Sequence, residues 1–241
     1  MRIMSEPPGL AGARSLAMGT AQRRPAWLRA TEGEHRWWIV LALVVTIAAQ
    51  FALPSRFVVH PAYIVPTIEA LLLVVLTVMH PDRLSERTQQ LRIASQVLLA
   101  IIAITNAISV GLLIHTITTG HHVAPVTLLI GGGEIWLTNT IVFALWYWEY
   151  DRGGPAARAH GTEDVPDLLF PQLTDEHLAR NWEPIFVDYL FVSFTNSTAF
   201  SPTDTMPLSR WAKLLFALQA SISLVTVALI AARAVNILPG T

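Results

Sequence analysis

Apolar residues are gathered along this chain into six long segments separated by polar breaks. A helix that crosses a bilayer needs about 20 predominantly apolar residues, and none of the segments has the alternating pattern of a barrel strand. Spanning backbone outside a closed barrel has to be helical, because lipid offers its polar groups no partners. The pattern therefore predicts helical segments over Trp37–Leu53, Tyr63–Met79, Ile93–Thr119, Val123–Trp148, Pro184–Phe200 and Trp211–Leu238.

The fifth segment differs from the others in its length and in how it ends. Pro184–Phe200 is short, and hydroxyl and amide residues close it before Pro202 and Pro207. Non-helical backbone at membrane depth is tolerated only where it lies against protein or water. We therefore expect an all-α, polytopic membrane helical bundle of five full spans, in which residues 184–200 form either a re-entrant pore helix or a sixth span.

The polar stretches divide the chain into three regions. Residues 1–36 are rich in Arg, Gly, Ala, Pro and Ser, so we expect a flexible basic tail. Residues 37–122 are expected to form a three-helix N-terminal membrane region. Residues 123–241 hold the remaining segments and the one long hydrophilic stretch of the sequence, an acidic loop over residues 149–183.

Composition narrows the class of protein. Hydrophobic types make up 53% of the 241 residues and charged types 14%, whereas a typical soluble domain has about 25% charged residues. The 16 basic and 17 acidic residues nearly cancel, so no nucleic-acid partner is expected. Cysteine is absent, which excludes disulfides and thiolate metal sites.

The sequence has no nucleophile turn, zinc-binding helix or phosphate loop. We predict neither an enzyme nor a cofactor, and we interpret His121-His122 as interfacial rather than as metal ligands.

The basic residues are distributed unevenly between the two ends of the predicted spans. The tail holds six, the loop over residues 81–92 holds three and the acidic loop holds three, and four full spans would bring these twelve to one side. The other side receives Arg56, Arg210 and Lys213. Cytoplasmic loops are enriched in Lys and Arg. We therefore expect a multi-pass protein of the cell membrane with a cytoplasmic N-terminus.

Ionisable side chains inside apolar segments are costly to bury, and they are therefore candidates for function. Glu134 shares a helical face with Thr127, Gly131 and Thr138, and such a small, polar face must meet protein or water. Glu134 is either hydrogen-bonded within a close helix packing, which Gly131-Gly132-Gly133 would allow, or part of an ion or proton site. The full set of intramembrane candidates is Glu69, His115, Glu134, Asp188 and Arg233.

Polar residues also follow one face of the sixth segment. Gln219, Ser223 and Thr226 have helical spacing, and they form either the wall of a pore or interhelical hydrogen bonds. The polar run at the end of the fifth segment favours the pore, because hydroxyl and carbonyl oxygens can replace part of an ion's hydration shell. We predict that Asp204 shapes the potential at the mouth, and that the constriction is formed by Thr195, Asn196, Ser197 and Thr198.

The same run carries a resemblance to a known family. The residues that match the family's pattern are Phe194, Thr195, Thr198, Asp204 and Pro207. Ser209-Arg210 and a long apolar helix follow them. This spacing resembles the filter of tetrameric cation channels, Phe-Thr-Thr-x-Thr-Thr-Val-Gly-Tyr-Gly-Asp-x-x-Pro. Ala199–Thr203 replaces Thr-Val-Gly-Tyr-Gly, and Pro202 cannot adopt the positive φ of the filter glycines. The resemblance implies outer, pore and inner helices in a homo-tetramer that conducts inorganic ions through a filter unlike that of potassium channels.

Two further stretches, Phe143–Trp148 and Asp188–Thr195, are similar to an uncharacterised family of bacterial predicted membrane proteins, a likeness that implies no activity. The leading hypothesis is an oligomeric, ion channel-like membrane protein with a filter that lacks glycine. The alternatives are a non-conducting structural or accessory membrane protein, and a small proton-coupled transporter that uses Glu134 or Asp188. In each case the expected partners are the lipid bilayer, further copies of the chain and inorganic ions.

Overall fold

The computed structural model describes residues 25–58, 60–79, 89–119, 123–162, 165–201 and 204–235, and it describes their side chains except in residues 79, 89–91, 176 and 233–235. Several features named above lie outside the described residues. These are the tail up to residue 24, Arg83 and Arg87, His121-His122, Pro202, the side chain of Arg233 and residues 236–241.

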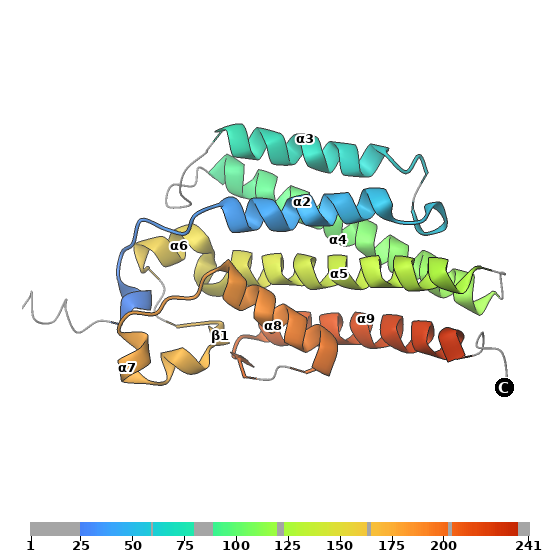
Figure 1. Ribbon diagram of the computed structural model, residues 1–241. Coiled ribbons are helices and arrows are strands. Elements are labelled where there is room, and N and C mark those ends of the chain that lie inside the picture. The colour runs from blue at the N-terminus through green and yellow to red at the C-terminus, as the bar shows by residue number, and fades with distance from the viewer. Residues whose placement is uncertain are drawn as a thin grey trace, which may run out of the picture.

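The described chain is mostly helical, as the apolar pattern predicted. In Figure 1, α2, α3, α5 and α9 follow a common direction, and α4 crosses behind them at an angle. The second half of α5 is the centre of the largest buried cluster, which also takes in residues of α2, α3, α4, α8 and α9. The main helices are α2 (Trp37–Ala52), α3 (Ile64–Met79), α4 (Gln89–Thr118), α5 (Pro125–Tyr150), α8 (Phe186–Ala199) and α9 (Arg210–Val235).

Three helices, α4, α5 and α9, are each long and apolar enough to cross a membrane. The helices α2 and α3 are apolar but have only 16 residues each. At a rise of about 1.5 Å per residue, each extends roughly 24 Å, against a hydrocarbon core of about 30 Å. The structure therefore agrees with a helical membrane protein, and the expectation of five full spans stays a prediction.

The glycine triplet in α5 packs against two different neighbours. A Cβ atom on Gly131 would lie 2.6 Å from the ring of Phe57, in the short 3₁₀ turn Ser55–Phe57. A Cβ atom on Gly132 would overlap the side chain of Ile230 in α9. Gly133 has no heavy atom within 4 Å of that position. The close packing that the triplet was expected to allow is therefore present at Gly131 and Gly132.

The acidic segment folds into short elements over the end of α5, as Figure 1 shows. Strand β1 pairs antiparallel with β2, so that Leu168 is opposite Pro207 and Leu169 is opposite Met206. Together with residues 25–36, these elements form what we call the cap, and the adjoining end of the bundle is the cap end. The cap elements are two 3₁₀ turns, Asp151–Gly153 and Pro171–Leu173, with α6 (Pro155–His160), β1 (Leu168–Leu169), α7 (Glu176–Ala179) and β2 (Met206–Pro207).

One buried carboxylate organises the cap. Asp151 Oδ1 accepts the backbone N–H groups of Asp167 at 3.0 Å and of Leu168 at 3.2 Å. Its Oδ2 accepts the hydroxyl of Tyr189 in α8 at 2.7 Å and lies 3.5 Å from Arg152 Nε. A charged acceptor with several donors is a strong hydrogen-bonding centre. Asp151 therefore ties the start of the acidic segment both to β1 and to α8.

Candidate functional site

Helix α8 starts at the cap end, and the chain returns to the cap end after it. The backbone N–H of Phe186 donates to Glu34 Oε1 at 2.8 Å, and the Phe186 ring packs edge-on against Trp148 near the end of α5. Beyond α8, Leu208 N donates to Asp167 O at 2.8 Å, beside the β1–β2 pair. Figure 1 shows α8 stopping part of the way along α5 and α9. The chain therefore enters and leaves α8 at the same end of the bundle.

The far end of α8 lies deep in the bundle. Thr140 Oγ1 donates to Ser197 Oγ at 3.2 Å, and Trp136 Nε1 lies 3.5 Å from the carbonyl oxygen of Ser197. Trp136 and Thr140 precede Tyr150, the last residue of α5, by roughly 15 to 21 Å at the helical rise of about 1.5 Å per residue. The end of α8 therefore lies beside the middle of α5.

A buried hydrogen-bond network joins α8 to α5 and α9, with the side chain of Gln219 at its centre. Gln219 Nε2 donates to Ser193 Oγ at 2.6 Å and to Ser197 Oγ at 2.7 Å. Gln219 Oε1 accepts from Tyr147 OH at 2.6 Å and from Asn196 Nδ2 at 2.9 Å. All five residues have an exposed fraction of 0%. A buried polar network of this kind favours one relative placement of the three helices.

The polar stripe predicted on the sixth segment lies inside the chain. Gln219 faces the network, and Ser223 Oγ accepts a hydrogen bond from Asn139 Nδ2 of α5 at 3.1 Å. Thr226 Oγ1 donates to Ile222 O of its own helix at 2.8 Å, and all three stripe residues are buried. Within one chain, Gln219 and Ser223 thus make interhelical hydrogen bonds, the second of the two interpretations that the sequence left open. A role in a pore wall stays a prediction.

The five residues predicted at the constriction and its mouth divide into two groups. Asn196 and Ser197 are buried in the network, on the side of α8 that faces α5 and α9. Thr195 is half-buried, and Thr198 and Asp204 are exposed. The hydroxyls of Thr195 and Thr198 donate to carbonyl oxygens of α8 itself. Of the five, Thr195, Thr198 and Asp204 are thus the ones that offer surface to a neighbour or to water.

The turn after α8 has an unusual backbone. Phe200 follows the last residue of the helix and has a φ of 57°, in the left-handed region. A bulky residue in this region is strained, and such strain gathers at functional sites. Phe200 and the adjacent Ala199 and Ser201 are exposed. The turn thus places exposed, strained backbone near the middle of the bundle.

The two predicted carboxylates lie in different parts of the molecule. Asp188 Oδ2 accepts the backbone N–H of Ile185 at 2.8 Å, so Asp188 caps the start of α8 near the cap end. Glu134 is in the first half of α5, where it lines a cavity with residues of α2, α3 and α4. Glu134 and Asp188 therefore do not belong to a common site.

A third carboxylate, Glu34, holds the start of α8 to the cap. Its Oε1 accepts Phe186 N at 2.8 Å and its Oε2 accepts Trp148 Nε1 at 2.9 Å. Burial raises the pKa of Glu34 above its ordinary value of 4.5, although these two hydrogen bonds and the charge of Arg158 act in the opposite direction. Glu34 is therefore a titratable contact between residues 25–36, α5 and α8.

Sequence reasoning missed Tyr147, Ser193 and Glu34, and it named Asn196 and Ser197 without their bonds to Gln219. Tyr147 lies in an aromatic run of the kind found at membrane interfaces, which gave no reason to expect a central hydrogen bond. Ser193, Asn196 and Ser197 have the spacing i, i+3, i+4 of one helical face, and that pattern could have indicated a partner for Gln219. Glu34 precedes the first apolar segment and has no local motif that would single it out.

Within the described residues, no group of three or more His, Asp or Glu side chains could hold a metal ion. Comparisons with protein-family models, with curated proteins and with solved structures found no significant match to this chain. The site is therefore interpreted from its own geometry.

Proposed function

We propose that this chain is an oligomeric, ion channel-like membrane protein whose pore is built around the re-entrant helix α8 and the turn that follows it. The proposal depends on one observation. Residues 198–201 end a half-length helix near mid-bundle and are exposed on the single chain. Non-helical backbone at membrane depth is tolerated only against protein or a water-filled cavity. An oligomer arranged around an aqueous path would give this backbone both a protein neighbour and a water-filled cavity.

The arrangement of α5, α8 and α9 supports the same proposal. A long helix, a re-entrant half-helix and a second long helix are packed together, which is the order of outer, pore and inner helices expected from the resemblance to cation channels. In this proposal the buried network holds α8 in place. Thr195, Thr198 and Asp204 face the path, where hydroxyl and carboxylate oxygens suit a cation.

The distribution of charge supports a cytoplasmic cap. Eight described basic residues lie at the cap end, whereas Arg56 lies at the opposite end and Arg233 near the end of α9. If α8 is re-entrant, Arg210 and Lys213 lie at the cap end. If the fifth segment spanned the membrane, they would lie on the opposite side. By the enrichment of Lys and Arg in cytoplasmic loops, α8 enters from the cytoplasm. The eight residues are Arg29, Arg36, Arg92, Arg152, Arg158, Arg180, Arg210 and Lys213.

Electrical recording of the reconstituted protein tests the proposal. Ser201→Cys in this natural cysteine-free chain should make cation current sensitive to a membrane-impermeant cationic thiol reagent applied on the cap side. Phe191→Cys is the matched control, because Phe191 is exposed on the apolar face of the same re-entrant unit. Modification there should leave the current unchanged. A bilayer that stays silent in both cation and anion gradients, or a strictly monomeric protein in lipid, refutes the proposal.

A second candidate, a non-conducting structural membrane protein, is favoured by one specific observation. Gln219 and Ser223 make their hydrogen bonds to other helices of the same chain. Helix α9 therefore presents few polar groups to a pore. This candidate predicts a stable oligomer that carries no current. Cross-linking through Ser201→Cys without any conductance would identify it.

A further inference from the structure

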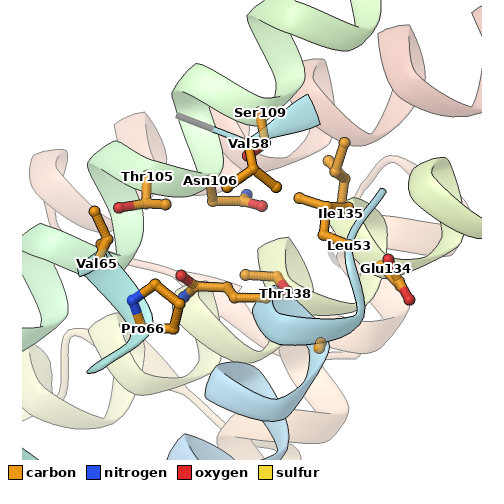
Figure 2. Close-up of a pocket in the computed structure, with 12 residues that line it drawn as sticks. Leu53, Val58, Val65, Pro66, Thr105, Asn106, Ser109, Glu134, Ile135 and Thr138 are labelled. Atoms are coloured by element: carbon orange, nitrogen blue, oxygen red, sulfur yellow. The ribbon is translucent and has the colours of Figure 1, made fainter. Parts of the chain in front are cut away.

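A second polar cluster lies in the half of the bundle away from α8. Gln50 of α2, Asn106 and Ser109 of α4, and Glu134 and Thr138 of α5 line a cavity that has about 20 Å³ of space for the centres of water molecules. That is enough for about one water. Figure 2 shows Asn106, Ser109, Glu134 and Thr138 around this space, with Leu53 and Pro66 at its sides.

The cavity is next to a fully buried carboxylate. Glu69 of α3 has an exposed fraction of 0%, and its Oε2 accepts a hydrogen bond from Gln50 Nε2 at 2.8 Å. Glu69 Oε1 and Gln50 Oε1 are both buried, and neither has a hydrogen-bond partner in the described part of the chain. Gln50 is itself more than nine-tenths buried and lines the cavity. Two oxygens on hydrogen-bonded side chains therefore lack a donor, and one of these side chains, Gln50, lines a space for one water.

The surrounding helices bring no positive charge to Glu69. Helix α2 has no ionisable side chain, and α4 has two, Arg92 and His115. Arg92 is near Glu149 at the cap end, and His115 is exposed. The ionisable side chain that lines the cavity itself is Glu134, which is also acidic. An isolated charge in this environment is strongly unfavourable, so the carboxylate needs a positive charge in the form of a proton or a metal cation.

We propose that Glu69 is an exchangeable proton-binding site, to which the cavity beside Gln50 delivers the proton through water. The carboxylate takes up the excess proton of a hydronium ion formed at that water, which leaves H2O and a neutral carboxylic acid, and release forms the hydronium ion again. The proton is favoured over an alkali cation because the hydrogen-bond partner of Glu69 among the described residues is an N–H donor, Gln50 Nε2, whereas an alkali cation needs several oxygen ligands. Asn106 and Ser109 line the same cavity and offer polar groups to that water.

The cavity lies toward the end of the bundle opposite the cap. Gln50 is in the last turn of α2 and Glu69 in the second turn of α3. Leu53 and Val58, from the connection between these helices, also line the cavity. Protons therefore reach Glu69 from the side opposite the cap. This inference uses none of the residues of the proposed pore and stands or fails separately from it.

Labelling with N,N′-dicyclohexylcarbodiimide, which reacts with protonated carboxyl groups in apolar surroundings, tests the inference on the intact protein in lipid. The adduct would be located by tandem mass spectrometry. We expect an adduct on Glu69 at pH 6 that falls at least about fivefold by pH 9, because only the protonated form reacts. Glu69→Gln should abolish this adduct, and Glu134→Gln should leave it unchanged.

Absence of a Glu69 adduct across this pH range in folded protein would overturn the inference. Weaker labelling of Glu69 in excess NaCl or LiCl than in choline chloride would also overturn the inference. That result would assign the site to an alkali cation. The pH dependence of the Glu69 adduct is measured on the wild-type protein, so the result does not depend on whether the variants fold. Ion currents are not part of the readout, so a silent bilayer leaves this test intact.

Discussion

Gln219→Leu removes the central side chain of the network and nearly preserves its volume. Gln219 makes hydrogen bonds with four side chains on two other helices, namely Tyr147, Ser193, Asn196 and Ser197. Interhelical hydrogen bonds in membrane proteins average about 0.6 kcal/mol each, which gives about 2.5 kcal/mol for this set. The hydroxyl of Tyr147 would also lose its acceptor, at a cost of about 1 kcal/mol or more. We expect the free energy of unfolding to fall by about 3 to 4 kcal/mol.

Reversible unfolding in mixed micelles of rising SDS content, followed by tryptophan fluorescence, would measure this loss. Ser221→Leu is the matched control, because Ser221 is exposed on α9 and bonds only Ala217 O of its own helix at 2.8 Å. It should change stability by no more than about 0.5 kcal/mol. Tyr147→Phe should cost about 1 kcal/mol less in the Gln219→Leu background than alone, because its partner is already absent. Equal stability of Gln219→Leu and wild type would refute the role assigned to the network.

Two further predictions concern helix packing and pH. Gly131→Ala places a methyl group within 2.6 Å of the Phe57 ring and should cost about 1 to 3 kcal/mol in the same unfolding assay. Gly133→Ala meets no neighbour and should be neutral or stabilising by up to about 1 kcal/mol; equal losses would contradict the packing described. Because the pKa of Glu34 is raised, its contribution to stability is present below pH 4.5 and is lost as the pH rises through the raised value. Glu34→Gln should flatten the profile of Tm against pH above 4.5. An unchanged slope would exclude Glu34 as the cause of the pH dependence of Tm.

The positions of the helices could be predicted from the sequence because each apolar run ends at a physical signal. Pro54 closely follows the end of α2, and Pro125 is the first residue of α5, where its missing N–H costs nothing. The segment predicted over residues 184–200 matches α8 to within two residues at its start and one at its end. The sequence left open whether this segment re-enters or spans, and what the structure adds is that the chain enters and leaves α8 at the cap end.

Which neighbour a polar side chain meets could not be predicted. Helical spacing put Gln219, Ser223 and Thr226 on one face, but spacing does not say whether that face meets water or another helix. The answer depends on where α8 lies, and this is fixed by tertiary contacts such as that between Tyr189 and Asp151. For the same reason Glu69 was one of several intramembrane candidates, and its pairing with Gln50 depends on the register of two helices.

The dependence of α8 on Gln219 has a consequence for how the protein is made. Because α8 precedes α9 in the chain, α8 emerges from the ribosome before Gln219 does. With 14 residues and a polar face, α8 is too short to insert as an independent span. It should therefore wait at the membrane surface until α9 has inserted and supplied the partners for Ser193, Asn196 and Ser197. Insertion of α8 would then be the last step of biogenesis, and a chain that stops before Gln219 would leave this helix outside the bilayer.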